Sequence, residues 1–187
     1  MERSSVSPSK PLPNLKEPES YTSPGRSAAY YGDAVFIAAR RLTCQTWAAA
    51  NVAAYCYRFN AIPAGIPPVI GATHFQEVAF VFYNLAGVGY APAAAPPFAG
   101  KPQGYADLAR LMDGSWVSFV HDLDPNSFRA GADRARFAGV PAWPRYDARN
   151  PQNFVFDANV TSYAEPDTFR AEGIALINSA NAGVYHR

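Results

Sequence analysis

The sequence predicts a mixed α/β fold in which strands and helices alternate around a central sheet. Residues 52–59 alternate aromatic and smaller side chains, as a strand with one buried face does. Residues 105–121 carry apolar side chains at the i, i+3, i+4 spacing of an amphipathic helix. The 187 residues suffice for one domain with its own core, and the 17 prolines favour fixed turns over a helix bundle.

Composition narrows the class of protein. The chain is 49% apolar and 17% charged, as ordinary globular proteins are. A net charge of +1 gives no electrostatic reason to expect a nucleic acid or a membrane surface as partner. No stretch approaches the roughly 20 apolar residues that span a bilayer. Residues 1–5 are polar and no apolar signal-peptide core follows them, so the sequence leaves the localisation open.

The first part of the chain is predicted to change from a poorly ordered leader to regular secondary structure. Residues 1–28 are rich in proline, serine and charge, which predicts a poorly ordered leader. Asp33 is expected to be the N-cap of a helix over 34–50. The strand over 52–59 follows that helix.

The middle of the chain alternates loops and helices. Residues 60–73 contain prolines and glycines and predict a loop. Residues 74–84 are expected to begin as a turn and to become a short helix. A second irregular stretch over 92–102 precedes the helix at 105–121, and Asp124-Pro125-Asn126 ends that region.

The last third is predicted to contain short elements. Residues 143–146 and 153–156 are expected to be short, exposed strands. A terminal helix is expected over 167–179. Its inward side chains would be Phe169, Ile174, Ala175 and Ile177.

Two cysteines and one sequon say little on their own about the compartment in which the protein works. Cys44 is expected on the helix and Cys56 on the strand after it, and two buried thiols that act as small apolar side chains are the favoured interpretation. A disulfide between them is the alternative. Asn159-Val160-Thr161 fits a glycosylation site, which matters only if the chain enters a secretory pathway.

Several segments together resemble the type-B carboxylesterase and cholinesterase family. Gly71-Ala72-Thr73-His74-Phe75-Gln76-Glu77 is similar to the family's histidine segment. Further segments match its tail in the same order: Met112, Trp116 and Phe119; Asp124-Pro125-Asn126; Trp143-Pro144 and Tyr146; the strand 154–156; and Asp167 with Arg170. Fungal lipases and esterases are the members that the chain resembles most. The resemblance implies that residues 29–187 are the C-terminal part of an α/β-hydrolase domain, with an incomplete central sheet and flanking helices.

The resemblance also implies which residues carry chemistry. In this family the histidine is the last triad member along the chain, after the serine and the acid, so His74 is the candidate catalytic residue. Its imidazole would take a proton from the serine and return it to the leaving alcohol. Glu77 would order the histidine loop through hydrogen bonds. The alternatives are a histidine that satisfies a loop carbonyl and a glutamate that is an exposed helix carboxylate.

The rest of the catalytic machinery is not expected in this chain. An esterase needs Gly-x-Ser-x-Gly on a strand-to-helix turn. The near match Gly25-Arg26-Ser27-Ala28-Ala29 has no strand before it and lacks the final glycine, so we interpret it as a coincidence. The sequence contains no Gly-Gly oxyanion loop, and Asp33 is better explained as a helix cap than as the triad acid. The chain alone is therefore expected to be inactive.

No metal or cofactor is expected. His74 and Glu77 have the spacing of a metalloprotease helix, but Val78 stands where that pattern needs a histidine. His121 and His186 have no ligand-like spacing, and His121 fits the C-terminal end of a helix.

Two functions remain open from the sequence. The first is a carboxylic-ester hydrolase of the serine esterase or lipase type, acting on a small-molecule ester, of which this chain is a fragment. The alternative is a non-catalytic cholinesterase-like module that binds proteins through exposed aromatic side chains. In either case an open strand edge predicts self-association.

Overall fold

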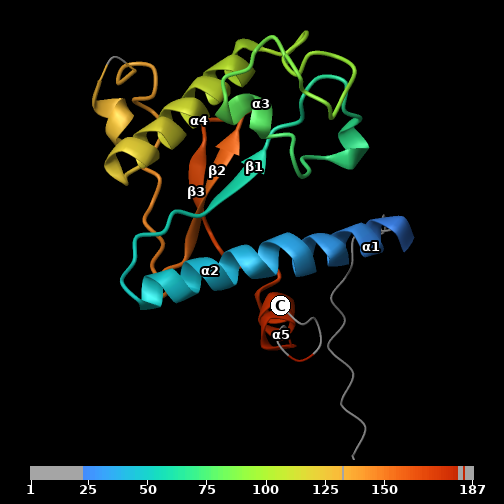
Figure 1. The fold of residues 1–187 in the computed structure, drawn as a ribbon, viewed down its shortest axis with the longest axis vertical. Helices are drawn as coiled ribbons and strands as arrows, with labels where there is room; N and C mark the ends of the chain where they lie inside the picture. Colours follow the sequence, from blue (N-terminus) through green and yellow to red (C-terminus); the bar gives the residue numbers. More distant parts are fainter. Residues whose placement is uncertain (1–22, 132, 181–182, 184–187) are drawn as a thin grey trace, which may run out of the picture.

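A three-stranded sheet lies between two groups of helices (Figure 1). The computed structural model describes residues 23–131, 133–180 and 183. Its helices and helical turns are α1 (Ser23–Gly32), the π-helical turn η1 (Asp33–Ile37), α2 (Ala38–Ala49), the 3₁₀ turn η2 (Pro68–Ile70), α3 (Val78–Val81), α4 (Gln103–Asp122), the 3₁₀ turn η3 (Ser127–Ala130) and α5 (Ala171–Ala180). Its strands are β1 (Tyr57–Asn60), β2 (Gln152–Asp157) and β3 (Tyr163–Pro166).

The sheet has the order β1-β2-β3. β1 runs parallel to β2, with Tyr57 opposite Phe154, and β2 runs antiparallel to β3, with Val155 opposite Tyr163. Among the described strands, none pairs with the other edge of β1. The outer edge of β3 has no partner among these strands either, so the sheet is mixed and has two open edges within the described residues.

β1 is shorter than the strand predicted over 52–59. The chain before it does form sheet-like hydrogen bonds. The carbonyl of Ala54 accepts from the Tyr146 N–H at 2.8 Å, and the carbonyl of Cys56 accepts from the Phe154 N–H at 2.9 Å. The first of these bonds goes to an irregular segment rather than to a strand, so the regular strand begins only at Tyr57.

The exposure predicted for the two later strands is wrong. β2 is buried from Asn153 to Asp157 because it is the middle strand and is covered on both faces. Residues 143–146 do not form a strand at all. Trp143 is only 7% exposed, and its indole Nε1 donates to the Cys56 carbonyl at 3.0 Å. The aromatic residues that suggested exposed strands are core residues.

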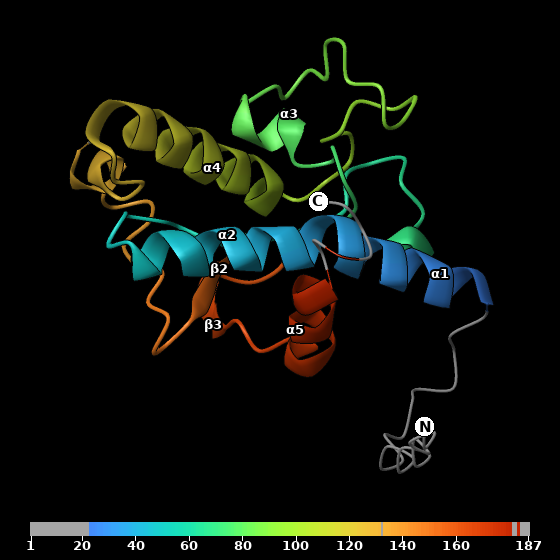
Figure 2. The same ribbon diagram turned by 60° about the horizontal axis from the view of Figure 1, so that its bottom comes forward.

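The N-terminal helix begins earlier than predicted. α1, η1 and α2 form one continuous helix (Figure 2), so Asp33 is not an N-cap and lies in its middle, where its carboxylate pairs with the Arg170 guanidinium at 2.7 Å. A proline in a first helical turn loses no hydrogen bond, which allows the start at Ser23-Pro24. Of the leader predicted over 1–28, residues 1–22 lie outside the described residues and the remainder is helical.

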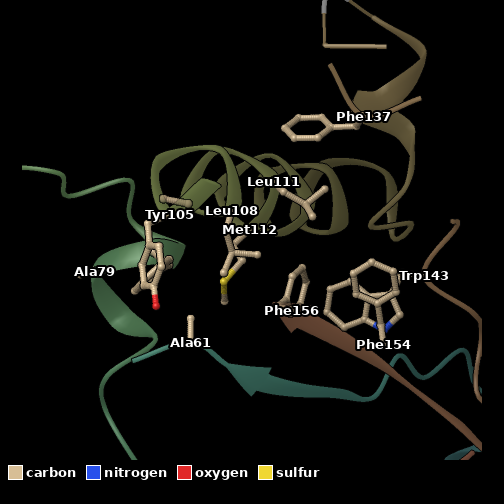
Figure 3. Packing of buried hydrophobic residues seen from close by; sticks show 12 residues of the cluster. Ala61, Ala79, Tyr105, Leu108, Leu111, Met112, Phe137, Trp143, Phe154 and Phe156 are labelled. Carbon is tan, nitrogen blue, oxygen red and sulfur yellow. The ribbon is translucent and has the colours of Figure 1, made fainter. Parts of the chain in front are cut away.

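The main core lies between α4 and one face of the sheet, and α4 confirms the helix predicted over 105–121. Figure 3 shows Leu108 and Met112 of α4 directed at the strands, with Phe156, Phe154 and Trp143 next to one another. These large side chains are buried because the apolar residues of α4 lie on one side of the helix, and that side packs against one face of the sheet.

The opposite face of the sheet packs against α2. Cys44 of α2 forms a disulfide with Cys56, so the expectation of two free thiols is wrong. The buried stripe of α2 places Cys44 over the residue just before β1. The same helix sends Arg40 to the Asn153 side chain on β2, at 2.8 Å. The disulfide therefore ties the long helix to the sheet.

A buried carboxylate joins α2, β2 and the chain before α5. Asp167 accepts hydrogen bonds from both guanidinium groups of Arg40 and Arg41, from the Asn153 amide and from the Tyr146 hydroxyl. The helix predicted from residue 167 starts only at Ala171 because the preceding residues make these contacts.

The face predicted for the terminal helix is only partly right. Ile174 is buried against α2, at 1% exposure, whereas Phe169 is 56% exposed. Ala175 is also exposed and Ile177 is half-buried. α5 contacts α2 and η1 along a narrow strip, so Ile174 is the one residue of its ten that is buried. Among the described helices, none is both long and apolar enough to cross a bilayer.

Candidate active-site segment

His74 lies in a tight turn over residues 73–76 that follows β1 and η2. The N–H of Gln76 donates to the Thr73 carbonyl at 3.3 Å. The buried side chain of Gln76 closes the same turn: its Oε1 accepts from the Thr73 N–H at 3.2 Å, and its Nε2 donates to the Thr73 Oγ1 at 2.8 Å. This clamp fixes both ends of the turn and leaves the imidazole exposed.

The residue after His74 has an unusual backbone conformation. Phe75 has a φ of +74°, as the third residue of a type II turn requires, and that position normally takes glycine. A side chain in this region costs about 1 kcal/mol or more. Gly71, which leads into the turn, has a φ of +72° without that cost. Backbone strain of this kind is concentrated at functional sites.

Two aromatic rings contact the His74 imidazole. The ring of Phe36, from η1, lies with its centroid 5.1 Å away and its plane tilted by 33°. The ring of Phe75 is edge-on at 6.3 Å. Within the described residues, no hydrogen bond to the imidazole accompanies these contacts. Ring contacts are therefore the interactions of the imidazole within the described residues.

Glu77 is half-buried and lies near two tyrosines. Burial is the largest cause that raises the pKa of Tyr90, to about 12, and the negative charge of Glu77 is the second cause. The same two causes raise the pKa of Tyr57. The Tyr90 hydroxyl donates to the Gln76 carbonyl at 3.3 Å. In the described part of the chain, no hydrogen bond joins Glu77 to His74. The Glu77 carboxylate thus lies near Tyr57 and Tyr90, with no hydrogen bond to the ring within the described residues.

Sequence reasoning missed the residues that hold the turn and the ring. Thr73 and Gln76 have the Thr-x-x-Gln spacing of a capping box, in which the glutamine side chain reaches back to the threonine N–H. That spacing could have found the clamp. Phe36 gave no comparable pattern, because its contact with His74 depends on how a distant helix is placed.

The turn borders a small apolar hollow of about 230 Å³. Its lining residues are Phe75, Val78, Ala79, Phe82, Asn84, Val88, Gly89 and Tyr90. Complete ligand pockets usually measure about 300–1,000 Å³. This hollow can take a small apolar group, but it is smaller than a complete ligand pocket.

The other histidines and the serine motif lie elsewhere. His121 is exposed in the last turn of α4, where its ring contacts the Asp122 carboxylate, and His186 lies outside the described residues. The described residues contain no group of three metal-ligating side chains. Residues 25–29 lie inside α1 rather than at a strand-to-helix turn.

Comparison with known proteins gives one family match and several structural matches. The model of the "Carboxylesterase family" matches residues 13–171. The crystal structure of the Geobacillus stearothermophilus carboxylesterase EST55 at pH 6.2 superposes with a TM-score of 0.61 and 28% identity, over 85% of this chain and 29% of that chain. A PNB esterase matches with a TM-score of 0.46 and 20% identity, over 66% of this chain and 21% of that chain. No curated protein matches. The chain spans less than a third of the length of EST55, and its fold is part of an α/β-hydrolase.

Proposed function

We propose, since this chain belongs to the carboxylesterase family, that it supplies the proton-transferring histidine, His74, of a serine carboxylesterase that hydrolyses small-molecule carboxylic esters. The observation that carries the proposal is the turn itself. An exposed imidazole follows a sheet strand, on a turn clamped by Gln76 and strained at Phe75. A loop after the carboxyl end of a strand is where α/β folds place their reactive groups.

The chemistry divides into two half-reactions, each with two proton transfers through His74. A serine hydroxyl attacks the ester carbonyl while its proton moves to a ring nitrogen of His74, and the same proton then goes to the departing alcohol. In the second half, water loses a proton to the imidazole and attacks the acyl-serine, and the serine oxygen regains the proton as the acid leaves.

The serine must come from outside this sequence. The near match at residues 25–29 is helical, and a nucleophile needs a sharp turn that exposes its oxygen. Triad members act as a unit, so an isolated histidine retains almost none of the rate gain. The chain alone is therefore inactive under this proposal, and activity requires a segment with the nucleophile and the oxyanion donors.

The test combines the chain with the missing part. We would co-express it with a truncated EST55 that lacks the region matched by this chain, and assay hydrolysis of a p-nitrophenyl ester and labelling by a fluorophosphonate. Activity that needs both parts, is lost in His74→Gln and is kept in the control His121→Gln is the expected result. Stoichiometric serine labelling of the chain alone, lost in His74→Ala, would overturn the claim of inactivity. Equal activity with and without His74 would overturn its role.

A protein-binding module is the second candidate, and exposed apolar side chains favour it. Val69 is 94% exposed and Phe82 is 74% exposed, both close in sequence to the histidine turn. Such side chains mark interaction surfaces when they gather in a patch. A monodisperse monomer that captures no partner in a pulldown would argue against this function.

A further inference from the structure

The contact between Phe36 and His74 joins two segments that are distant in the sequence. Phe36 lies on η1, in the middle of the long helix, and its ring contacts the imidazole with a centroid distance of 5.1 Å and an angle of 33° between the ring planes. We infer that Phe36 is a positioning residue that sets the ring plane of His74. The inference rests on the proposed function, because it concerns how the proton-transferring ring is held.

The π-helical turn presents Phe36 to the histidine. A π-helical turn holds one more residue than an α-helical turn, so it changes the direction of the side chains that follow. Such single turns inside α-helices occur frequently at functional sites. Here the turn covers Asp33–Ile37, between two stretches of ordinary α-helix.

The turn is also fixed from outside. Asp33, its first residue, pairs with the Arg170 guanidinium at 2.7 Å, and this ion pair joins η1 to the chain just before α5. The ring of Tyr31 contacts the edge of Phe36 at a centroid distance of 6.5 Å. Phe36 is 44% exposed, so these contacts, more than burial, hold its position.

A ring contact suits a side chain that must transfer protons. The tilted Phe36 ring restricts the rotation of the imidazole without forming a hydrogen bond to either ring nitrogen, so the nitrogens can reach a hydroxyl. Proton transfer requires a heavy-atom distance of about 2.6–3.2 Å, and a misplacement of about 1 Å can lower the rate roughly 100-fold. A fixed ring plane therefore prepares His74 before the missing part of the enzyme is bound.

The first experiment uses the chain alone. In NMR spectra of the imidazole groups, the ring current of Phe36 shifts the His74 ring protons. Phe36→Ala should return these signals toward the values of a free histidine and leave those of His121 unchanged. Phe36→Tyr should preserve the shift. Leu42→Ala, also on the long helix and also exposed, is the control with no effect. Unchanged His74 signals in a folded Phe36→Ala chain would overturn the inference.

The second experiment uses the chain paired with truncated EST55. Phe36→Ala should lower kcat about tenfold with little change in KM, and Phe36→Tyr should restore it. If the wild-type pair is active and Phe36→Ala keeps full kcat, the inference is wrong and the proposed function stands. If the wild-type pair is inactive, the proposed function is wrong, and the imidazole spectra still decide whether Phe36 fixes the ring.

Discussion

Among the described residues, the Asp167 carboxylate accepts the most side-chain hydrogen bonds. Burial raises its pKa, but the hydrogen bonds and charges of Arg40 and Arg41 outweigh burial and hold that pKa well below its usual range. Removal of one partner from a buried ion pair costs about 3–5 kcal/mol. We predict that Asp167→Asn lowers the free energy of unfolding by this amount in urea titrations at neutral pH. Tyr146→Phe, which removes one hydrogen bond to the same carboxylate, should cost only about 1 kcal/mol.

The same carboxylate predicts the response to acid. Its folded-state pKa lies below the unfolded value of about 3.9, so its contribution is complete above that pH and is lost as the pH falls toward the folded pKa. Stability should therefore decline below about pH 4. Unfolding midpoints measured at pH 5 and pH 3 should differ more for the wild type than for Asp167→Asn. An equal acid dependence in both proteins would contradict the assignment.

The strained backbone at Phe75 gives a second residue-scale prediction. At a φ of +74°, glycine is favoured over alanine by about 1 kcal/mol. Phe75→Gly should thus be more stable than Phe75→Ala in urea titrations. The control is Ala39→Gly at an exposed position inside α2, where glycine should cost about 1 kcal/mol. If alanine is the better residue at both positions, the turn does not have this conformation.

The histidine turn and its Thr73–Gln76 clamp are visible in the sequence, but the contacts that reach the turn from other elements are not. His74 belongs to a contiguous segment that resembles a family motif, and contiguous patterns are visible without a structure. Phe36 and Tyr90 reach the turn from other elements. Their contacts depend on tertiary packing, which a single sequence does not display.

At the scale of elements, the disulfide is the covalent link between the long helix and the sheet. Cys44 and Cys56 are 12 residues apart, and closing a loop of about 15 residues contributes about 3 kcal/mol in the chain-entropy model. We predict that a reductant, or the double change Cys44→Ala and Cys56→Ala, lowers the free energy of unfolding by about 2–3 kcal/mol. The double variant should not respond to the reductant. A wild-type chain whose unfolding is unaffected by reduction would refute this.

Element predictions succeeded where periodicity decided the structure and failed where packing did. α4 has a long apolar repeat, so its position follows from sequence alone. Residues 143–146 alternate like a strand, but Trp143 faces the core and donates to the Cys56 carbonyl instead of joining a ladder. β3 was missed because four residues around Ala164 and Pro166 give no strand pattern.

For the molecule as a whole, the open edge of β1 is the main consequence of a partial fold. The Cys56 carbonyl bonds to β2, so in this parallel pair the backbone groups of Tyr57 and Phe59 are directed to the other edge. Within the described residues, no strand pairs with that edge. In a complete α/β-hydrolase such an edge would be covered by a neighbouring strand, and here it is a template for pairing.

We predict that the isolated chain self-associates through that edge and through exposed apolar residues in the loop that follows β1. Val69 lies in η2, in the loop that leaves β1, and is 94% exposed. Sedimentation velocity should show a mass that rises with concentration. Loss of one buried apolar side chain costs about 1.5 kcal/mol, so Val69→Lys should weaken association roughly tenfold.

Val120→Lys is the matched control. Val120 is 80% exposed in the last turns of α4, outside the loop that leaves β1, so this change should have little effect. A chain that stays monomeric at every concentration would show that the β1 edge is not available for pairing.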